Sequence, residues 1–369
     1  MAARPERRGL AAAAWRGGIA LSALLAAANL LIGLSGGLAR LGWPLPTAAL
    51  SEHGAVMVCG FFGTVIALER AVALHRLVGL LAPLAAGLGG VAVWGLGQTT
   101  VGAMVWIFAG LALAGLYLLA GLTRAWSVHL KVELAAALVW AAGVGAWALG
   151  DPLAAQLAWM AFLVGTIAGE RRELMQFVHL SPGARWAFLA MVGAGAAGVA
   201  LVMAGSAAPG LAFWWSACAA LALWLLRWDI APRQWRRAGW AGHTGICLTV
   251  GYVWLLLAAL LGGLGLVDPT STLAPLARHA LLLGFVFAMV FGHAPIILPA
   301  LSGLRPVYTR WVRLPIWLLA VSLLLRLAAL AQDDAGLLAA AGLGHAVAIL
   351  LFAVTMATAA LRGARARRR

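Results

Sequence analysis

The stretch LARHALLLGFVFAMVFGHAPIILPA, residues 276–300, decides the class of this fold. A helix needs about 20 predominantly apolar residues to cross the hydrocarbon core of a bilayer, and this stretch is longer. Its only charged or imidazole side chains are Arg278, His279 and His293. The stretch therefore predicts a membrane-spanning helix.

The rest of the chain has the same composition. Hydrophobic residues make up 64% of the 369 residues and charged residues 10%, whereas soluble domains are about 25% charged. Disorder is excluded because disordered chains are poor in apolar residues. Cys59, Cys218 and Cys247 lie in apolar runs, which predicts buried thiols and no disulfide scaffold. What remains is a polytopic membrane protein.

Twelve apolar segments are long enough to span a bilayer. The connections between them are short and contain helix-ending residues such as proline and glycine. We expect an all-α bundle of twelve transmembrane helices in a single membrane domain, residues 1–369. The predicted spans are approximately 18–38, 53–74, 78–97, 101–122, 133–150, 154–178, 186–205, 208–226, 242–266, 276–300, 312–331 and 335–361.

The distribution of the 26 basic residues, which give a net charge of +15, predicts the topology. If the N-terminus is cytoplasmic and the spans alternate, every basic residue except Arg40, Arg278 and Arg326 falls on the cytoplasmic side. This asymmetry satisfies the positive-inside rule. We therefore expect both termini in the cytoplasm of a bacterium and a multi-pass protein of its inner membrane. Membrane lipid, and no nucleic acid, is the expected partner of the positive charge.

Two histidines are expected near the outer face. Imidazole and charged groups inside a bilayer are costly and usually face the bundle interior. His53 and His279 each begin an even-numbered predicted span, which places both rings at a similar depth. Two neutral imidazoles at one depth can bind a heme iron from both sides. The alternative is two interfacial histidines that are hydrogen-bonded to loops.

Four further residues complete the predicted heme site. Met57 and Gly60 follow His53 at helical spacing, and glycine on that side would leave room for a flat macrocycle. Arg278 and Arg326 are expected near the outer face, where a guanidinium can pair with heme propionates.

The run His53-Gly54-Ala55-Val56-Met57 followed by Phe61-Phe62 resembles the second helix of the catalytic subunit of heme–copper oxidases. Residues 279–289 resemble the tenth helix of that subunit. In that family each of these helices supplies one axial ligand of the low-spin heme. The resemblance implies that His53 and His279 are the two axial ligands here.

The chain is also similar to the NnrS family of heme-containing membrane proteins, which belongs to the same superfamily and is linked to nitric-oxide stress. The similar runs are His279-Ala280 with Gly292-His293, and Ala168-Gly169 with the arginines that follow. Ala277 stands where the oxidases have a histidine for a second heme, and spans six and seven lack their copper-binding histidines at the expected depths. The resemblance thus implies electron transfer or a nitric-oxide-related role, a membrane or periplasmic electron donor, and no oxygen-reducing centre of the oxidase type.

A second polar layer is expected near the inner face, at Glu69, Glu170, His243 and His293. These nitrogen and oxygen ligands could bind copper or another metal. They could equally handle protons or substrate, or form an ion-pair network. His345, in the last predicted span, is expected to make a helix-packing hydrogen bond.

The sequence therefore favours a heme-binding membrane protein of the oxidase-like superfamily. The alternative is a twelve-span secondary transporter that uses the intramembrane Glu, Arg and His side chains. An assembly factor for a partner complex is a third interpretation, and the short predicted loops disfavour it.

Overall fold

The computed structural model of the chain describes residues 5–46, 48–176, 178–267 and 272–366. Within these ranges the chain is helical and contains no strand. In the described part of the chain, twelve helical stretches are long and apolar enough to cross a membrane, which confirms the predicted all-α twelve-helix fold. They are Leu10–Ala39, His53–Leu74, Leu77–Leu96, Thr99–Thr123, Val128–Ala148, Pro152–Leu174, Pro182–Met203, Ala207–Trp228, Gly239–Leu264, Leu273–Ser302, Arg310–Ala331 and Ala335–Ala366.

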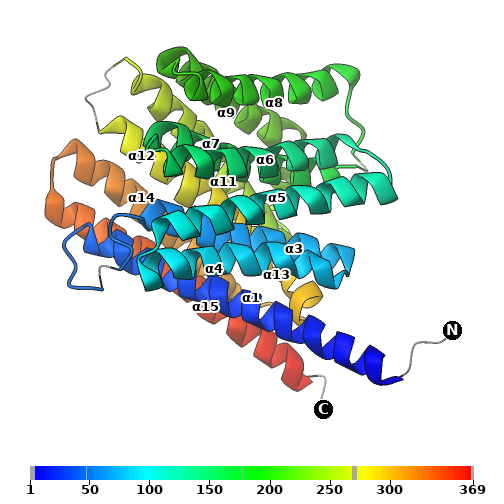
Figure 1. The fold of residues 1–369 in the computed structure, drawn as a ribbon. Helices are drawn as coiled ribbons and strands as arrows, with labels where there is room; N and C mark the ends of the chain where they lie inside the picture. Colours follow the sequence, from blue (N-terminus) through cyan, green and yellow to red (C-terminus); the bar gives the residue numbers. More distant parts are fainter. Residues whose placement is uncertain (1–4, 47, 177, 268–271, 367–369) are drawn as a thin grey trace. The chain divides into compact units, whose positions relative to one another are not determined.

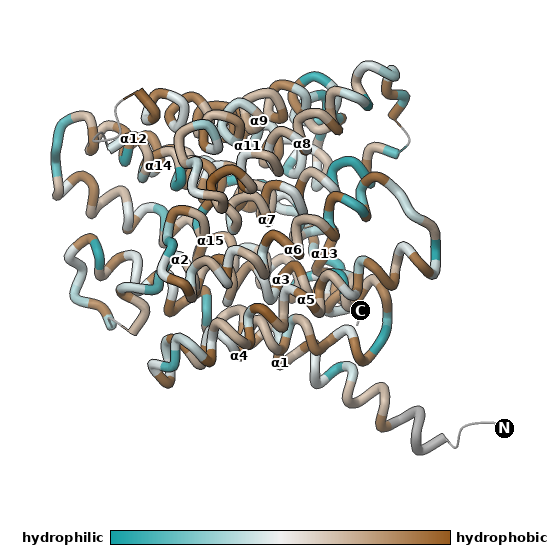
Figure 2. The backbone as a smooth tube through the Cα atoms, turned by 45° about the horizontal axis from the view of Figure 1, so that its top comes forward, coloured by the Kyte–Doolittle hydropathy of each residue, from teal (hydrophilic) through white to brown (hydrophobic). Residues whose placement is uncertain are grey.

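The contacts within the chain divide it into two compact units, Met1–Gly169 and Glu170–Arg369. In Figure 1 the first unit runs from blue to green and the second from green to red. Hydrophobic residues predominate along the helices of both units, as the brown segments of Figure 2 show. The expectation of a single membrane domain over residues 1–369 stays a prediction.

The first unit is a set of helices that follow one another with short connections. Its elements are α1 (Pro5–Ala39), α2 (His53–Ala55), the π-helical segment η1 (Val56–Phe62), α3 (Gly63–Leu74), the 3-10 helix η2 (Leu77–Leu80), α4 (Leu81–Leu96), α5 (Thr99–Thr123), α6 (Val128–Ala148) and most of α7 (Pro152–Leu174). Asn29 joins α1 to α4, because its Nδ2 donates to Gly87 O at 3.1 Å and its Oδ1 accepts from Trp94 Nε1 at 3.2 Å. Buried polar side chains of this kind join helices inside a membrane.

The second unit contains the remaining helices, in which neighbours along the chain pack on one another, as α8 does on α9 and α14 on α15. Its elements after α7 are α8 (Pro182–Met203), α9 (Ala207–Trp228), α10 (Ala231–Gln234), α11 (Gly239–Leu264), α12 (Leu273–His279), the π-helical segment η3 (Ala280–Phe287), α13 (Ala288–Ser302), the 3-10 helix η4 (Arg310–Arg313), α14 (Leu314–Ala331) and α15 (Ala335–Ala366). Phe291 stacks on Phe352 with ring centroids 4.1 Å apart, which ties α13 to α15. The three cysteines of the chain are buried and free, as predicted.

Candidate functional site

His53, in the first unit, is the first residue of α2 and rests on α1. Its Nδ1 lies 2.6 Å from the carbonyl oxygen of Gly33. Since a carbonyl only accepts, Nδ1 carries the proton and the neutral ring has its lone pair on Nε2. A Cβ added at Gly37, one turn further along α1, would lie 2.7 Å from His53 Cε1. The Gly33 carbonyl therefore orients this imidazole, and the missing side chain of Gly37 leaves room for its ring.

Side chains of neighbouring helices approach the glycines that follow His53. A Cβ at Gly60 would lie 2.5 Å from Asn29 Oδ1, and one at Gly63 would lie 2.6 Å from Trp140 Cζ2. Met57 is buried, and a Cβ at Gly33 would lie 2.9 Å from its Cγ. Side chains of α1 and α6 thus fill this face. Gly60 allows Asn29 to approach, and its place beside a macrocycle stays a prediction.

His279, in the second unit, has the same hydrogen-bonding pattern as His53. Its Nδ1 lies 2.8 Å from the carbonyl oxygen of Pro275, so Nδ1 donates and Nε2 is the basic nitrogen. Both histidines are partly exposed. A π-helical segment follows each one, Val56–Phe62 in one unit and Ala280–Phe287 in the other. π-helical turns are rare and occur frequently at functional sites.

A second polar group in the same unit lies between α14 and α15. Ser322 Oγ donates to Leu319 O at 2.9 Å, so it accepts from His345 Nδ1 at 2.7 Å. The expected helix-packing hydrogen bond of His345 is therefore present. His345 Nε2 and Arg326 Nε are both buried and have no hydrogen-bond partner among the described residues. Arg278 is partly exposed on α12, which packs against α14.

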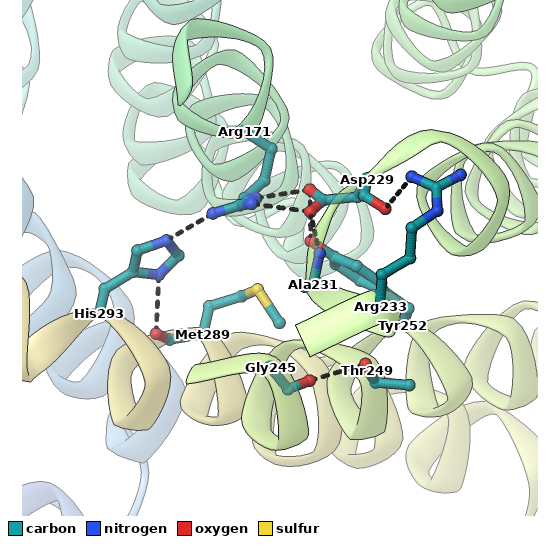
Figure 3. A network of polar contacts seen from close by, with 9 residues as sticks. All are labelled: Arg171, Asp229, Ala231, Arg233, Gly245, Thr249, Tyr252, Met289 and His293. Carbon is teal, nitrogen blue, oxygen red and sulfur yellow. Dashed lines mark hydrogen bonds and ion pairs between the residues drawn. The ribbon is translucent and has the colours of Figure 1, made fainter. Parts of the chain in front are cut away.

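A buried ion pair lies at the centre of the polar network in Figure 3. Arg171 at the end of α7 donates to both carboxylate oxygens of Asp229, from Nε and Nη2, at 2.8 Å each. The Tyr252 hydroxyl donates to Asp229 Oδ2 at 3.0 Å, and the backbone N–H of Ala231 to Oδ1 at 2.8 Å. Arg171 is 4% exposed and Asp229 1%. The carboxylate is thus saturated with donors, and the two charges compensate each other.

Both ring nitrogens of His293 are used in this network. Nε2 accepts from Arg171 Nη1 at 3.2 Å, and Nδ1 donates to Met289 O at 2.9 Å. His243 donates from Nε2 to Phe291 O at 2.9 Å, so it reaches the same helix through a separate bond. The two histidines support helix packing here.

The structure gives no support to the predicted second metal site. Among the described residues, no three His, Cys, Asp or Glu side chains lie close enough together to hold a metal ion. Glu69, in the middle of α3, and Glu170, in the last part of α7, are partly exposed. His293 is bound to a guanidinium, and the ion-pair network that the sequence left as an alternative is what forms around it. A metal site formed by Glu69, Glu170, His243 and His293 stays a prediction.

Two buried carboxylates, Asp229 and Glu133, also lie in the interior. Neither is among the site residues predicted from the sequence. Asp229 follows α9 directly and is the only acidic residue between Glu173 and Asp268, which is the signal that could have found it. In the first unit, Glu133 is fully buried and accepts from Arg70 Nη2 at 2.8 Å. Each unit therefore pairs a buried carboxylate with an arginine of its own, and of these arginines Arg70 is partly buried and Arg171 is buried.

These features define a multi-pass, all-helical membrane protein with buried ion pairs and two carbonyl-anchored histidines. Over residues 19–361 the sequence matches a family described as a domain of unknown function, DUF8744, and the chain belongs to that family. None of the curated proteins matches the chain.

Proposed function

We propose that this chain is a heme-binding protein of the bacterial cytoplasmic membrane, in which His53 and His279 are ligands of the heme iron. The observation that carries the proposal is the local structure that the two histidines share. In each, Nδ1 donates to a backbone carbonyl, and a π-helical segment follows the ring. Metal-binding histidines almost always donate their other ring N–H to such a partner, which fixes the tautomer and the ring orientation.

The chemistry of the proposed donors fits a heme. The carbonyls of Gly33 and Pro275 hold Nδ1 protonated, so each ring offers Nε2 as its basic nitrogen. Arg326 is 8% exposed and has an orphaned Nε–H. A buried guanidinium without a carboxylate partner is costly, and a propionate would compensate it. Arg278 is the second proposed propionate partner.

A heme with two histidine ligands transfers single electrons and has no open coordination position. The chain would then act in electron transfer and would need a membrane or periplasmic electron donor. The nitric-oxide-related role rests on the NnrS resemblance alone. An oxygen-reducing centre of the oxidase type is not part of the proposal.

The ligand assignment is tested with single variants and visible spectra. We expect His53→Ala and His279→Ala each to abolish the spectrum of a six-coordinate low-spin heme. His75→Ala is the matched control, because His75 is exposed at the end of α3. If either ligand variant keeps the wild-type spectrum, that histidine is not a ligand.

A secondary transporter is the second candidate, and the buried pair Arg171–Asp229 favours it. Intramembrane charges mark substrate and ion pathways in many carriers. This candidate predicts uptake of a solute by proteoliposomes under an imposed proton gradient, and loss of uptake in Asp229→Asn. A purified protein that binds no heme, even when heme is supplied during expression, would favour the transporter candidate.

A further inference from the structure

Two loops of the second unit are rich in arginine and poor in acid. Residues 227–237 contain four arginines and residues 305–313 contain three. They are Arg227, Arg233, Arg236, Arg237, Arg305, Arg310 and Arg313. Asp229 is the one acidic residue in these loops, and Arg171 already binds its carboxylate. Within the described part of the chain none of the seven is ion-paired with a carboxylate, so their charge is uncompensated.

Direct contacts join the two loops into one surface. Arg313 Nη2 donates to the carbonyl oxygen of Arg237 at 3.2 Å. Trp240 Nε1 donates to the carbonyl oxygen of Pro306 at 3.0 Å, and its ring lies edge-on to Tyr308, with centroids 5.4 Å apart. We call five of these seven arginines, those of residues 233–237 and 310–313, the arginine surface. Its members are Arg233, Arg236, Arg237, Arg310 and Arg313.

The aromatic neighbours of the arginine surface indicate that it lies at the level of the lipid headgroups. The Arg236 guanidinium lies 4.8 Å from the ring centroid of Trp235, and that of Arg310 lies 5.1 Å from Trp311. Both tryptophans are exposed, Trp235 by 48% and Trp311 by 61%. Exposed Trp is enriched where a helix leaves the hydrocarbon core and enters the headgroup layer. Stacking also holds the guanidinium planes in place.

The arrangement favours an anion with several oxygens. Arg310 and Arg313 are the ends of the 3-10 helix η4, and in a 3-10 helix residues three apart lie on the same face. Arg313 Nε is buried and has no acceptor among the described residues. Guanidinium groups bind phosphate oxygens through paired N–H donors. Because these groups are at headgroup level, the phosphate within reach is that of a phospholipid.

We propose that the arginine surface is a binding site for the phosphate of an anionic phospholipid. Basic clusters where a chain leaves the membrane bind anionic headgroups, at about 1 kcal/mol for each arginine. This site does not depend on heme, and it is separate from the buried network around Asp229, whose charge is already balanced. The lipid would compensate the excess charge and hold the two loops together.

The test is native mass spectrometry of the purified protein with phosphatidylglycerol and with phosphatidylcholine of the same acyl chains. Arg236→Ala with Arg310→Ala removes two exposed side chains that make no hydrogen bond in the described structure, so the fold is expected to persist. We expect this double variant to bind phosphatidylglycerol about thirtyfold more weakly than wild type. Phosphatidylcholine is expected to bind weakly to both.

The matched control is Arg16→Ala with Arg76→Ala, which removes two exposed arginines of the first unit. We expect this control to bind phosphatidylglycerol as wild type does. An equal loss in both double variants would mean that binding follows net charge alone and would overturn the proposal. So would equal affinity for the two lipids, or glycerol phosphate competing as well as the intact lipid does.

Discussion

Asp229→Asn is expected to destabilise the protein more than almost any other substitution of similar size. The change keeps the volume of the side chain but removes the charge that compensates Arg171, which is 4% exposed. Breaking a buried ion pair by removing one partner costs about 3–5 kcal/mol. That is a large share of the roughly 5–15 kcal/mol by which proteins are stable.

Removing both charges is expected to restore most of the loss. The double variant Arg171→Met with Asp229→Leu leaves neither of these two charges buried. Its loss in free energy of unfolding is then only that of the groups that remain unpaired. The Tyr252 hydroxyl loses its acceptor, which costs about 1–3 kcal/mol, and adding Tyr252→Phe should recover that part. Arg233→Ala is the control, because Arg233 is exposed and donates only to backbone oxygens, that of Asp229 at 3.5 Å and that of Arg227 at 3.3 Å. It should cost less than about 1 kcal/mol.

The assay is reversible unfolding in detergent micelles. Arg171→Met, Asp229→Leu and their double variant form the double-mutant cycle, and Asp229→Asn and the triple variant are measured beside it. We expect strong coupling between Arg171 and Asp229. A cost below about 1 kcal/mol for Asp229→Asn, or a double variant no more stable than the two singles, would refute it.

Further expectations concern the first unit and the proposed propionate site. Gly37→Ala places a Cβ 2.7 Å from His53 Cε1 and should both weaken heme retention and destabilise by about 1–3 kcal/mol; Gly115→Ala, with open space around it, should be neutral or stabilising in the same unfolding assay. Arg326→Met should raise the thermal stability of heme-free protein and lower its heme content after reconstitution, and unchanged heme content would exclude a propionate role. Asn29→Ala should cost about 1–3 kcal/mol in chemical unfolding, because Trp94 Nε1 and Gly87 O lose their partner.

The membrane spans could be predicted because the bilayer imposes a simple rule. A segment in lipid must satisfy its own backbone hydrogen bonds and stay apolar for about 20 residues, so length and composition reveal it. The second span, His53–Leu74, has the predicted bounds. The first begins at Leu10, before the predicted residue 18, because an alanine-rich stretch continues the helix beyond its most apolar part.

The contacts inside the bundle could not be predicted in the same way. Glycine at residue 60 permits a close approach, but which group approaches depends on the neighbouring helix, and here it is Asn29. Likewise, Asp229 lies beside arginines in the sequence, yet its partner is Arg171, 58 residues earlier. Helical periodicity assigns a face to a residue and does not identify the helix that packs on that face.

The visible spectrum of the purified protein, recorded oxidised and then reduced with dithionite, tests the heme proposal most directly. The account predicts a sharp Soret band, with narrow α and β bands after reduction, from about one six-coordinate low-spin heme per chain. A preparation that stays colourless, even after heme is supplied during expression, would contradict it.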